Sequence, residues 1–157
     1  MGLTYRSQSL QESDDARTSD YYFDLIEGLP GFEPPQVRGE DVIAPGRQGR
    51  YVGNRVNDFQ ELLIEGFIKG SGTDPAERSE DWRANTETIM AVFGLDSAPG
   101  ELEAAPGSNS YLGLVSPWTI QVRTLDVMPG PILNRMSFQT WSIRLECVDG
   151  LWWVEGS

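Results

Sequence analysis

The chain has 157 residues, a length typical of one domain, and its 24 acidic and 12 basic side chains give a net charge of −12. Lys69 is the only lysine. This balance excludes binding to DNA by neutralisation of many phosphates, and it excludes attraction to anionic membrane surfaces. Histidine is absent, which removes the commonest general base and the usual zinc ligand.

Glycine and proline are frequent, with 17 and 10 residues, which favours a β-rich fold with many turns. The single cysteine, Cys147, excludes an internal disulfide and stands in an apolar run, so we expect a buried thiol. The sequence contains no stretch of about 18 apolar residues and no signal-peptide pattern. We therefore expect a soluble protein without a membrane anchor.

A polar segment opens the chain. Residues 8–19, QSLQESDDARTS, contain Leu10 as their only large apolar residue. Such a composition buries too little apolar surface to order by itself, so we expect residues 1–19 to form a flexible arm, or one that orders only against a neighbour. A single domain is expected over residues 20–157.

Strand patterns follow. Residues 21–28 are aromatic and β-branched and end at a Leu-Pro-Gly turn, and residues 36–44 and 47–53 predict a short hairpin around Pro45-Gly46. The longest candidate is residues 58–69, DFQELLIEGFIK. Its alternation places Leu62, Ile64, Gly66 and Ile68 on one face, with Glu61 and Glu65 on the other. Because both faces carry apolar residues, we expect this strand to be central.

One helix is predicted over Pro75–Phe93. Asp74 is a good N-cap, proline fits the first helical position, and Glu77 completes a capping-box pattern. Trp82, Ile89 and Phe93 recur at helical spacing and predict one apolar face. Gly94 stands where a left-handed C-cap is expected.

Strands return after the helix. Residues 101–105, 110–116 and 118–123 are candidates, Pro129-Gly130-Pro131 predicts a break, and residues 136–148 predict a long last strand with Trp141, Ile143, Leu145 and Cys147 on one face. The order predicts an α+β fold, an antiparallel β-sandwich or split barrel with one flanking α-helix.

No catalytic constellation is present. The glycine-rich Gly46–Gly53 lacks the Lys-Ser/Thr of a phosphate loop, no pair of acids is singled out, and no calcium-loop pattern occurs. We expect no enzymatic activity, no cofactor and no metal. Arg47, Arg50 and Arg55 form the only basic island, and two interpretations stay open: they meet acids of the same chain or acids of a neighbouring copy.

Several segments together resemble a known family. They are IAPGRQG at residues 43–49, LLIEGFIKG at 62–70, a single helix with Trp82-Arg83, and SIRLECVDGLWW at 142–153. Their order is similar to the N-terminal ring-forming domain of the distal tail proteins of long-tailed bacteriophages. Gly150 stands where the family has proline. The chain resembles the compact form without a carbohydrate-binding-like domain.

The resemblance implies a structural role in the virion. The family forms a hexameric ring at the distal end of the tail, made in the host cytoplasm, with a fold related to the tail-tube subunit. Its partners are further copies of itself, the tail-tube protein, the tail-tip (hub) or baseplate proteins and the tape-measure protein. DNA passes through the ring without specific binding.

Seven residues become candidate contacts under this resemblance. One of Trp152 and Trp153 is expected to close the end of the sandwich while the other meets a neighbour, together with Arg47, Arg50 and Arg55. Glu61 and Glu65 are candidates for lining the channel, where carboxylates repel DNA phosphates. The alternatives are a tail-tube subunit, a small carbohydrate-binding β-sandwich that exposes the two tryptophans, and a hydrolase built on acids alone.

Overall fold

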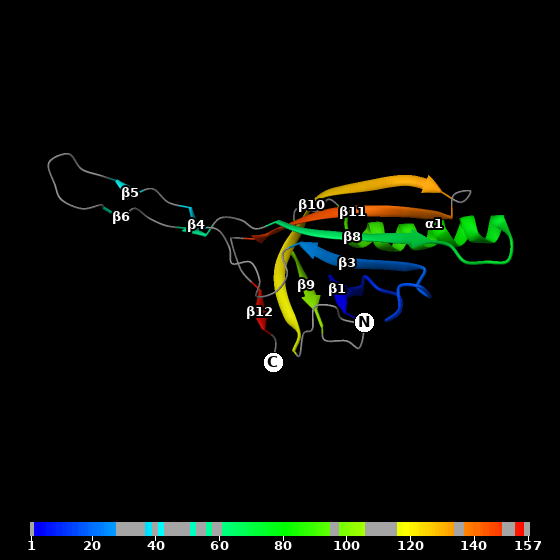
Figure 1. Cartoon of the computed structure of the whole chain (residues 1–157), viewed down its shortest axis with the longest axis horizontal. Coiled ribbons are helices and arrows are strands. Elements are labelled where there is room, and N and C mark those ends of the chain that lie inside the picture. Colours follow the sequence, from blue (N-terminus) through cyan, green and yellow to red (C-terminus); the bar gives the residue numbers. More distant parts are fainter. Residues whose placement is uncertain are drawn as a thin grey trace.

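The computed structural model describes residues 2–27, 37–38, 41–42, 51–52, 56–57, 61–94, 98–105, 116–133, 137–148 and 153–155. An eight-stranded antiparallel sheet dominates this part of the chain, and one helix lies against it (Figure 1). The main path runs β2 (Gln8–Ser9), β1 (Leu3–Tyr5), β9 (Gly100–Ala104), β10 (Trp118–Leu133), β11 (Phe138–Cys147), β8 (Glu61–Lys69) and β3 (Tyr21–Glu27), and β12 (Val154–Glu155) pairs with β10. The prediction of an α+β fold with antiparallel strands and one helix is confirmed.

β10 joins the two parts of the sheet. Its first residues, Trp118–Val122, pair with β9, whereas Val122–Leu133 pair with β11. Two short ladders stand apart from the main sheet, β4 (Val37–Arg38) with β7 (Val56–Asn57) and β5 (Asp41–Val42) with β6 (Tyr51–Val52). The predicted strands over residues 36–44, 47–53 and 110–116 lie wholly or partly outside the described residues.

β8 is central, as its two-sided apolar pattern predicts. It pairs with β11 on one side and β3 on the other. Leu62, Ile64 and Ile68 are fully buried, so the predicted inner face is confirmed. Gly66 allows β3 to approach closely, because a Cβ at this position would lie 2.1 Å from the Tyr22 carbonyl oxygen.

The helix α1 spans Pro75–Val92, close to the prediction. The Asp74 side chain caps it by accepting a hydrogen bond from the Glu77 N–H at 2.9 Å. The Glu77 carboxylate accepts from the Thr73 N–H and hydroxyl, both at 2.8 Å, one residue before the position that a capping box uses. The two acidic side chains therefore fix the start of the helix.

The apolar face of α1 is confirmed, but its predicted C-cap is wrong. Trp82, Ile89 and Phe93 are all buried. Phe93 ends the helix at φ −91° and ψ 10°, and its N–H donates to the Ile89 carbonyl. Gly94 has no positive φ. The Phe93 ring stacks on Tyr5 at 5.5 Å between centroids, so core packing rather than a left-handed glycine sets where the chain leaves the helix.

The N-terminal segment is not a flexible arm in this structure. β1 pairs with β9, and Tyr5 and Leu10 are fully buried in the core. Gln11 forms a bridge with Tyr22, which attaches the segment to β3. Ser19 is buried and its hydroxyl donates to the Asp15 carbonyl at 3.0 Å. The few apolar residues of the segment find partners within the same chain, which composition alone does not reveal.

β10 continues through Pro129-Gly130-Pro131, so the predicted break is also wrong. Proline lacks an N–H, but this half of β10 pairs with no described strand other than β11, and the register shifts between Pro129 and Ile132. The Gln139 side chain donates to the Gly130 carbonyl at 2.8 Å and holds the shifted strand to β11. The predicted inner face of β11, Trp141 to Cys147, is buried as expected, and burial raises the pKa of the Cys147 thiol to about 12.

Candidate functional site

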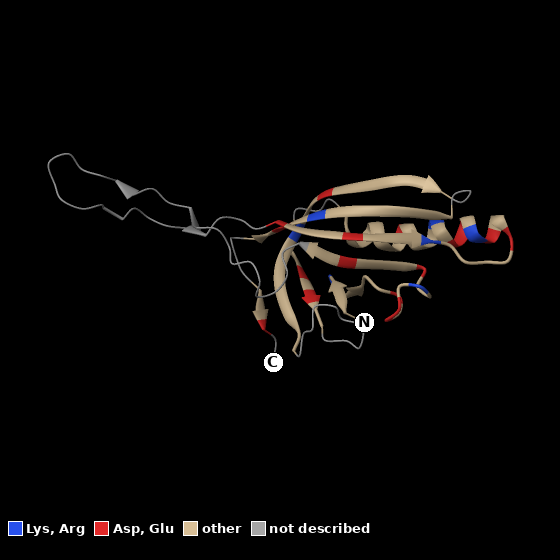
Figure 2. Cartoon of the chain, in the orientation of Figure 1, with Lys and Arg blue, Asp and Glu red and all other residues tan. Residues whose placement is uncertain are grey.

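The outer face of β3, β8, β11 and β10 carries several charged groups. Figure 2 shows acidic positions on β3 and β8 and a basic position on β11. The strand registers align these side chains in rows across the sheet: Asp24 is opposite Glu65, and Glu65 is opposite Ser142. Antiparallel pairing places such side chains within about 4.5–5.5 Å at Cβ, so each row acts as one patch.

Glu61 and Glu65, the two predicted channel acids, both lie on this outer face and are exposed. A carboxylate oxygen of Glu61 accepts from Arg144 Nη2 at 2.6 Å, and the next residue across, Glu146, pairs with Arg123. Within the described part of the chain, the Glu65 carboxylate accepts from the Ser142 hydroxyl, at 3.3 Å. The structure therefore places both acids on one face, and of the two only Glu61 has an ion-pair partner among the described residues.

Asp24 was not singled out from the sequence, yet it is the most perturbed carboxyl group on this face. Burial raises its pKa from 3.8 to about 6, against a smaller lowering by Gln11, whose Nε2 donates to the Asp24 carboxylate at 2.8 Å. The signal available in the sequence was an acid in the middle of the aromatic strand YYFDLIE. Asp24 becomes half-buried only in the folded chain, where Gln11 and β8 lie beside it.

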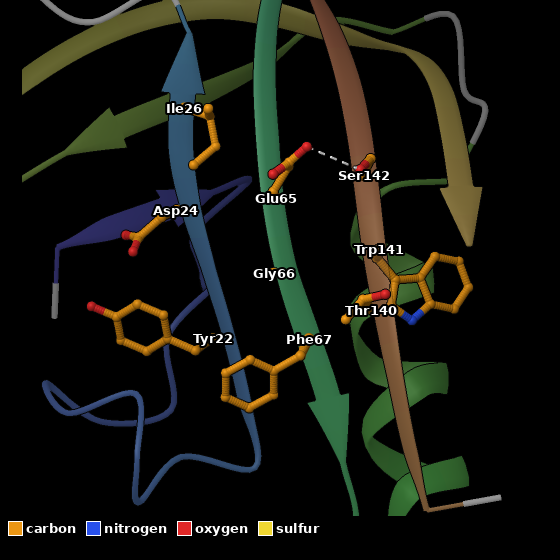
Figure 3. Close-up of a pocket in the computed structure, with 9 residues that line it drawn as sticks. All are labelled: Tyr22, Asp24, Ile26, Glu65, Gly66, Phe67, Thr140, Trp141 and Ser142. Atoms are coloured by element: carbon orange, nitrogen blue, oxygen red, sulfur yellow. Dashed lines mark hydrogen bonds between the residues drawn. The ribbon is translucent and has the colours of Figure 1, made fainter. Parts of the chain in front are cut away.

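An open depression of about 420 Å³ lies beside Asp24 on the outer face (Figure 3). Its floor is the backbone of β8 at Gly66. The Asp24 carboxylate stands on the β3 side, and the Glu65 carboxylate is directed toward Ser142 on β11. The lining residues are Tyr22, Asp24, Ile26, Glu65, Gly66, Phe67, Thr140, Trp141 and Ser142.

The second half of β10 has one edge without a partner strand among the described residues, and we call this its free edge. From Arg123 to Leu133, β11 is the only described strand that pairs with it. Four large apolar side chains of this half are 39–51% exposed, namely Leu125, Met128, Ile132 and Leu133. A long apolar edge with unpaired N–H and C=O groups is a surface that soluble proteins normally cover.

The predicted contact tryptophans and arginines are only partly described. Trp153 is 3% exposed and belongs to the core, so the sequence-based idea of an exposed two-tryptophan sugar platform is wrong for this residue. Burial of Trp153 is what we expected of the tryptophan that closes the end of the fold. Trp152, Arg47, Arg50 and Arg55 lie outside the described residues.

Within the described ranges, no helix is long and apolar enough to cross a membrane, and no group of three or more metal-ligating side chains comes together. The depression that the structure adds depends on β3, β8 and β11, which are far apart in the sequence.

No protein-family model and no curated protein matches the sequence. The fold is similar to the crystal structure of the Dit (gp 19.1) protein of phage SPP1, which is described as a paradigm of the hub adsorption apparatus in phages that infect Gram-positive bacteria. The match has a TM-score of 0.55 and 16% sequence identity, and it covers 95% of this chain and 50% of that chain. At this identity the likeness shows the fold alone: this chain has the fold of about half of that phage tail hub protein.

Proposed function

We propose that the protein is a structural, non-enzymatic component of a phage tail, a ring-forming subunit at the distal end where the tail tube meets the tip. The observation that carries this proposal is the likeness of almost the whole chain to a phage hub protein. Its partners would be further copies of itself, the tail-tube protein, the tip (hub) or baseplate proteins and the tape-measure protein. The protein would be made in the host cytoplasm and reside in the virion.

The free edge of β10 supports assembly from identical copies. Pairing this edge with a neighbour would satisfy its backbone groups and bury the exposed apolar side chains at Leu125, Met128, Ile132 and Leu133. A head-to-tail contact of this kind closes into a ring when the rotation between copies allows it. A ring of six copies is the size that the family resemblance suggests, with Arg47, Arg50, Arg55 and Trp152 as further candidate contacts.

The outer sheet face supports a channel for DNA. Glu61, Glu65 and Asp24 stand on this face, and a lining with excess negative charge repels phosphates and gives DNA no place to bind. We therefore expect that a gel-shift assay at low salt, with a duplex of any sequence, shows no retained DNA. A shifted band would contradict the channel assignment. In a protein of net charge −12, retained DNA would require a local basic site that binds phosphates.

Labelling of assembled phage particles tests the proposal and separates it from its nearest alternative. A peptide tag on this protein, detected with gold-conjugated antibody by electron microscopy, should mark one position at the end of the tail opposite the capsid. Label repeated along the tail would identify a tail-tube subunit instead. Particles that carry no label, although the tagged protein supports infection, would overturn a structural role in the tail.

A further inference from the structure

The free edge of β10 is interrupted at two places. The register of β10 with β11 shifts at Leu125, and it shifts again between Pro129 and Ile132. Extra residues of this kind form β-bulges, which bend a strand and disrupt the regular spacing of its backbone groups. Between the two shifts, Asp126–Pro129 pair with β11 residue for residue. Figure 1 shows this half of β10 at the margin of the sheet, beyond β11.

The second interruption also removes backbone donors. Pro129 and Pro131 are exposed, and neither has an N–H. The Gly130 carbonyl between them already accepts from the Gln139 side chain at 2.8 Å. A Cβ at Gly130 would lie 2.6 Å from the Thr140 hydroxyl oxygen and 2.9 Å from the Thr140 carbonyl oxygen, so the segment is held tightly against β11. It is therefore fixed in a form that offers few backbone groups to a neighbouring strand.

Together the two interruptions define where a neighbouring strand can pair. A strand that adds at Asp126–Met128 finds regularly spaced backbone groups. If it slides toward Leu133 it meets the prolines, and if it slides toward Arg123 it meets the bulge. Apolar side chains flank the regular section on both sides, because Leu125 is 39% exposed and Ile132 is 46% exposed. The edge thus favours one short ladder with apolar contacts around it.

A single register is what a closed ring requires. In a head-to-tail assembly every contact repeats the same rotation, and a rotation that does not close produces an open filament. A strand that pairs in another register changes the geometry of the contact, and a slip of one residue turns each of its side chains to the opposite face. A long, uninterrupted edge would accept several registers.

We propose that Pro129 and Pro131, with the bulge at Leu125, fix the register of the contact between copies by limiting strand pairing at the β10 edge to Asp126–Met128. The inference rests on the proposed assembly from identical copies and names the residues that decide its geometry. Prolines and bulges on an exposed edge also oppose unlimited strand addition. The same residues therefore favour a closed ring over an open filament.

Restoring the missing donors tests the proposal. Pro129→Thr with Pro131→Thr returns two N–H groups to the edge, and threonine suits an exposed strand. Sedimentation velocity over a series of protein concentrations and negative-stain electron microscopy measure the sizes of the assemblies, and thermal melts establish folding. The double variant should associate at least about tenfold more tightly than the wild type, into filaments or irregular sheets that grow with concentration. The wild type should give monomers and at most one closed assembly.

Pro131→Thr alone should show the same change to a smaller degree, and it decides the test if the double variant does not fold. The matched control is Pro117→Thr, directly before Trp118, where β9 and β12 flank β10 on its two sides. This control should behave like the wild type. A folded proline variant with the size distribution of the wild type overturns the proposal, as do filaments formed by the wild type or by Pro117→Thr. Gold label at the tail end would still support the proposed function in each of these cases.

Discussion

At the scale of single residues, Asp24 links the outer face to stability. Burial raises its pKa from 3.8 to about 6, so the folded state binds this proton more tightly than the unfolded chain does. The group therefore destabilises the fold at pH 7, and this loss disappears as the pH falls from about 7 through 6 toward 3.8. We predict that Asp24→Asn raises the free energy of unfolding at pH 7 by about 1 kcal/mol, a value that allows for solvent screening of a half-buried group.

Urea unfolding between pH 4.5 and 7.5 measures this effect. The side-chain amide introduced by Asp24→Asn keeps an oxygen that accepts from Gln11, so the variant should differ from the wild type near pH 7 and converge with it at low pH. Glu65→Gln is the control, since it removes the same charge from an exposed position opposite Asp24. A wild-type stability that decreases steadily from pH 7 to pH 5, with no difference from Asp24→Asn, would contradict the assignment.

At the scale of elements, the contact of α1 with the end of β8 depends on Gly70. A Cβ at this position would lie 1.8 Å from the Arg78 carbonyl oxygen and 2.6 Å from the Trp82 backbone nitrogen, both on the helix. Because neither is a flexible side chain, Gly70→Ala must push the helix away from the sheet and loosen the packing around Trp82. We predict a loss of about 3 kcal/mol in thermal or urea unfolding.

Gly94→Ala is the matched control at the other end of the helix. A Cβ there would have its nearest neighbours at 3.8 Å, and Gly94 has no positive φ that would strain an alanine. Its stability should stay within about 0.5 kcal/mol of the wild type. Equal effects of the two substitutions would show that helix packing does not depend on the close approach at Gly70.

At the scale of the whole molecule, the free edge of β10 is expected to govern assembly rather than folding. Ile132 is 46% exposed, so Ile132→Lys should change the stability of the isolated chain by about 0.5 kcal/mol or less. A lysine on a strand edge disfavours pairing with another strand. We predict that this variant melts like the wild type but gives fewer assembled tails in a complementation assay scored by electron microscopy.

The control for the edge is Val154→Lys, which places the same charge at a more exposed position, 64% accessible, on β12. Tails should assemble normally with this variant. Normal assembly with Ile132→Lys as well would assign the apolar edge no role in the contact between copies.

The sequence by itself determined the elements whose signals are local. Alternation placed Glu61 and Glu65 on the face opposite Leu62, Ile64 and Ile68, and the Asp74 cap with Pro75 located the start of α1 within one residue. These features follow from the period of a strand and the capping needs of a helix, which depend on residues a few positions apart. The α+β class followed from their order.

Features that depend on contacts between residues far apart in the chain were decided only by the tertiary structure. Residues 2–19 are ordered because β1 pairs with β9 and because Leu3, Tyr5 and Leu10 are buried in the core. β10 continues through Pro129-Gly130-Pro131 because, among the described strands, β11 is its one partner there. The alignment of Asp24 with Glu65 across β3 and β8 arises the same way, from which strands become neighbours. Strand pairing joins residues far apart in the chain, and no local period or cap encodes that choice.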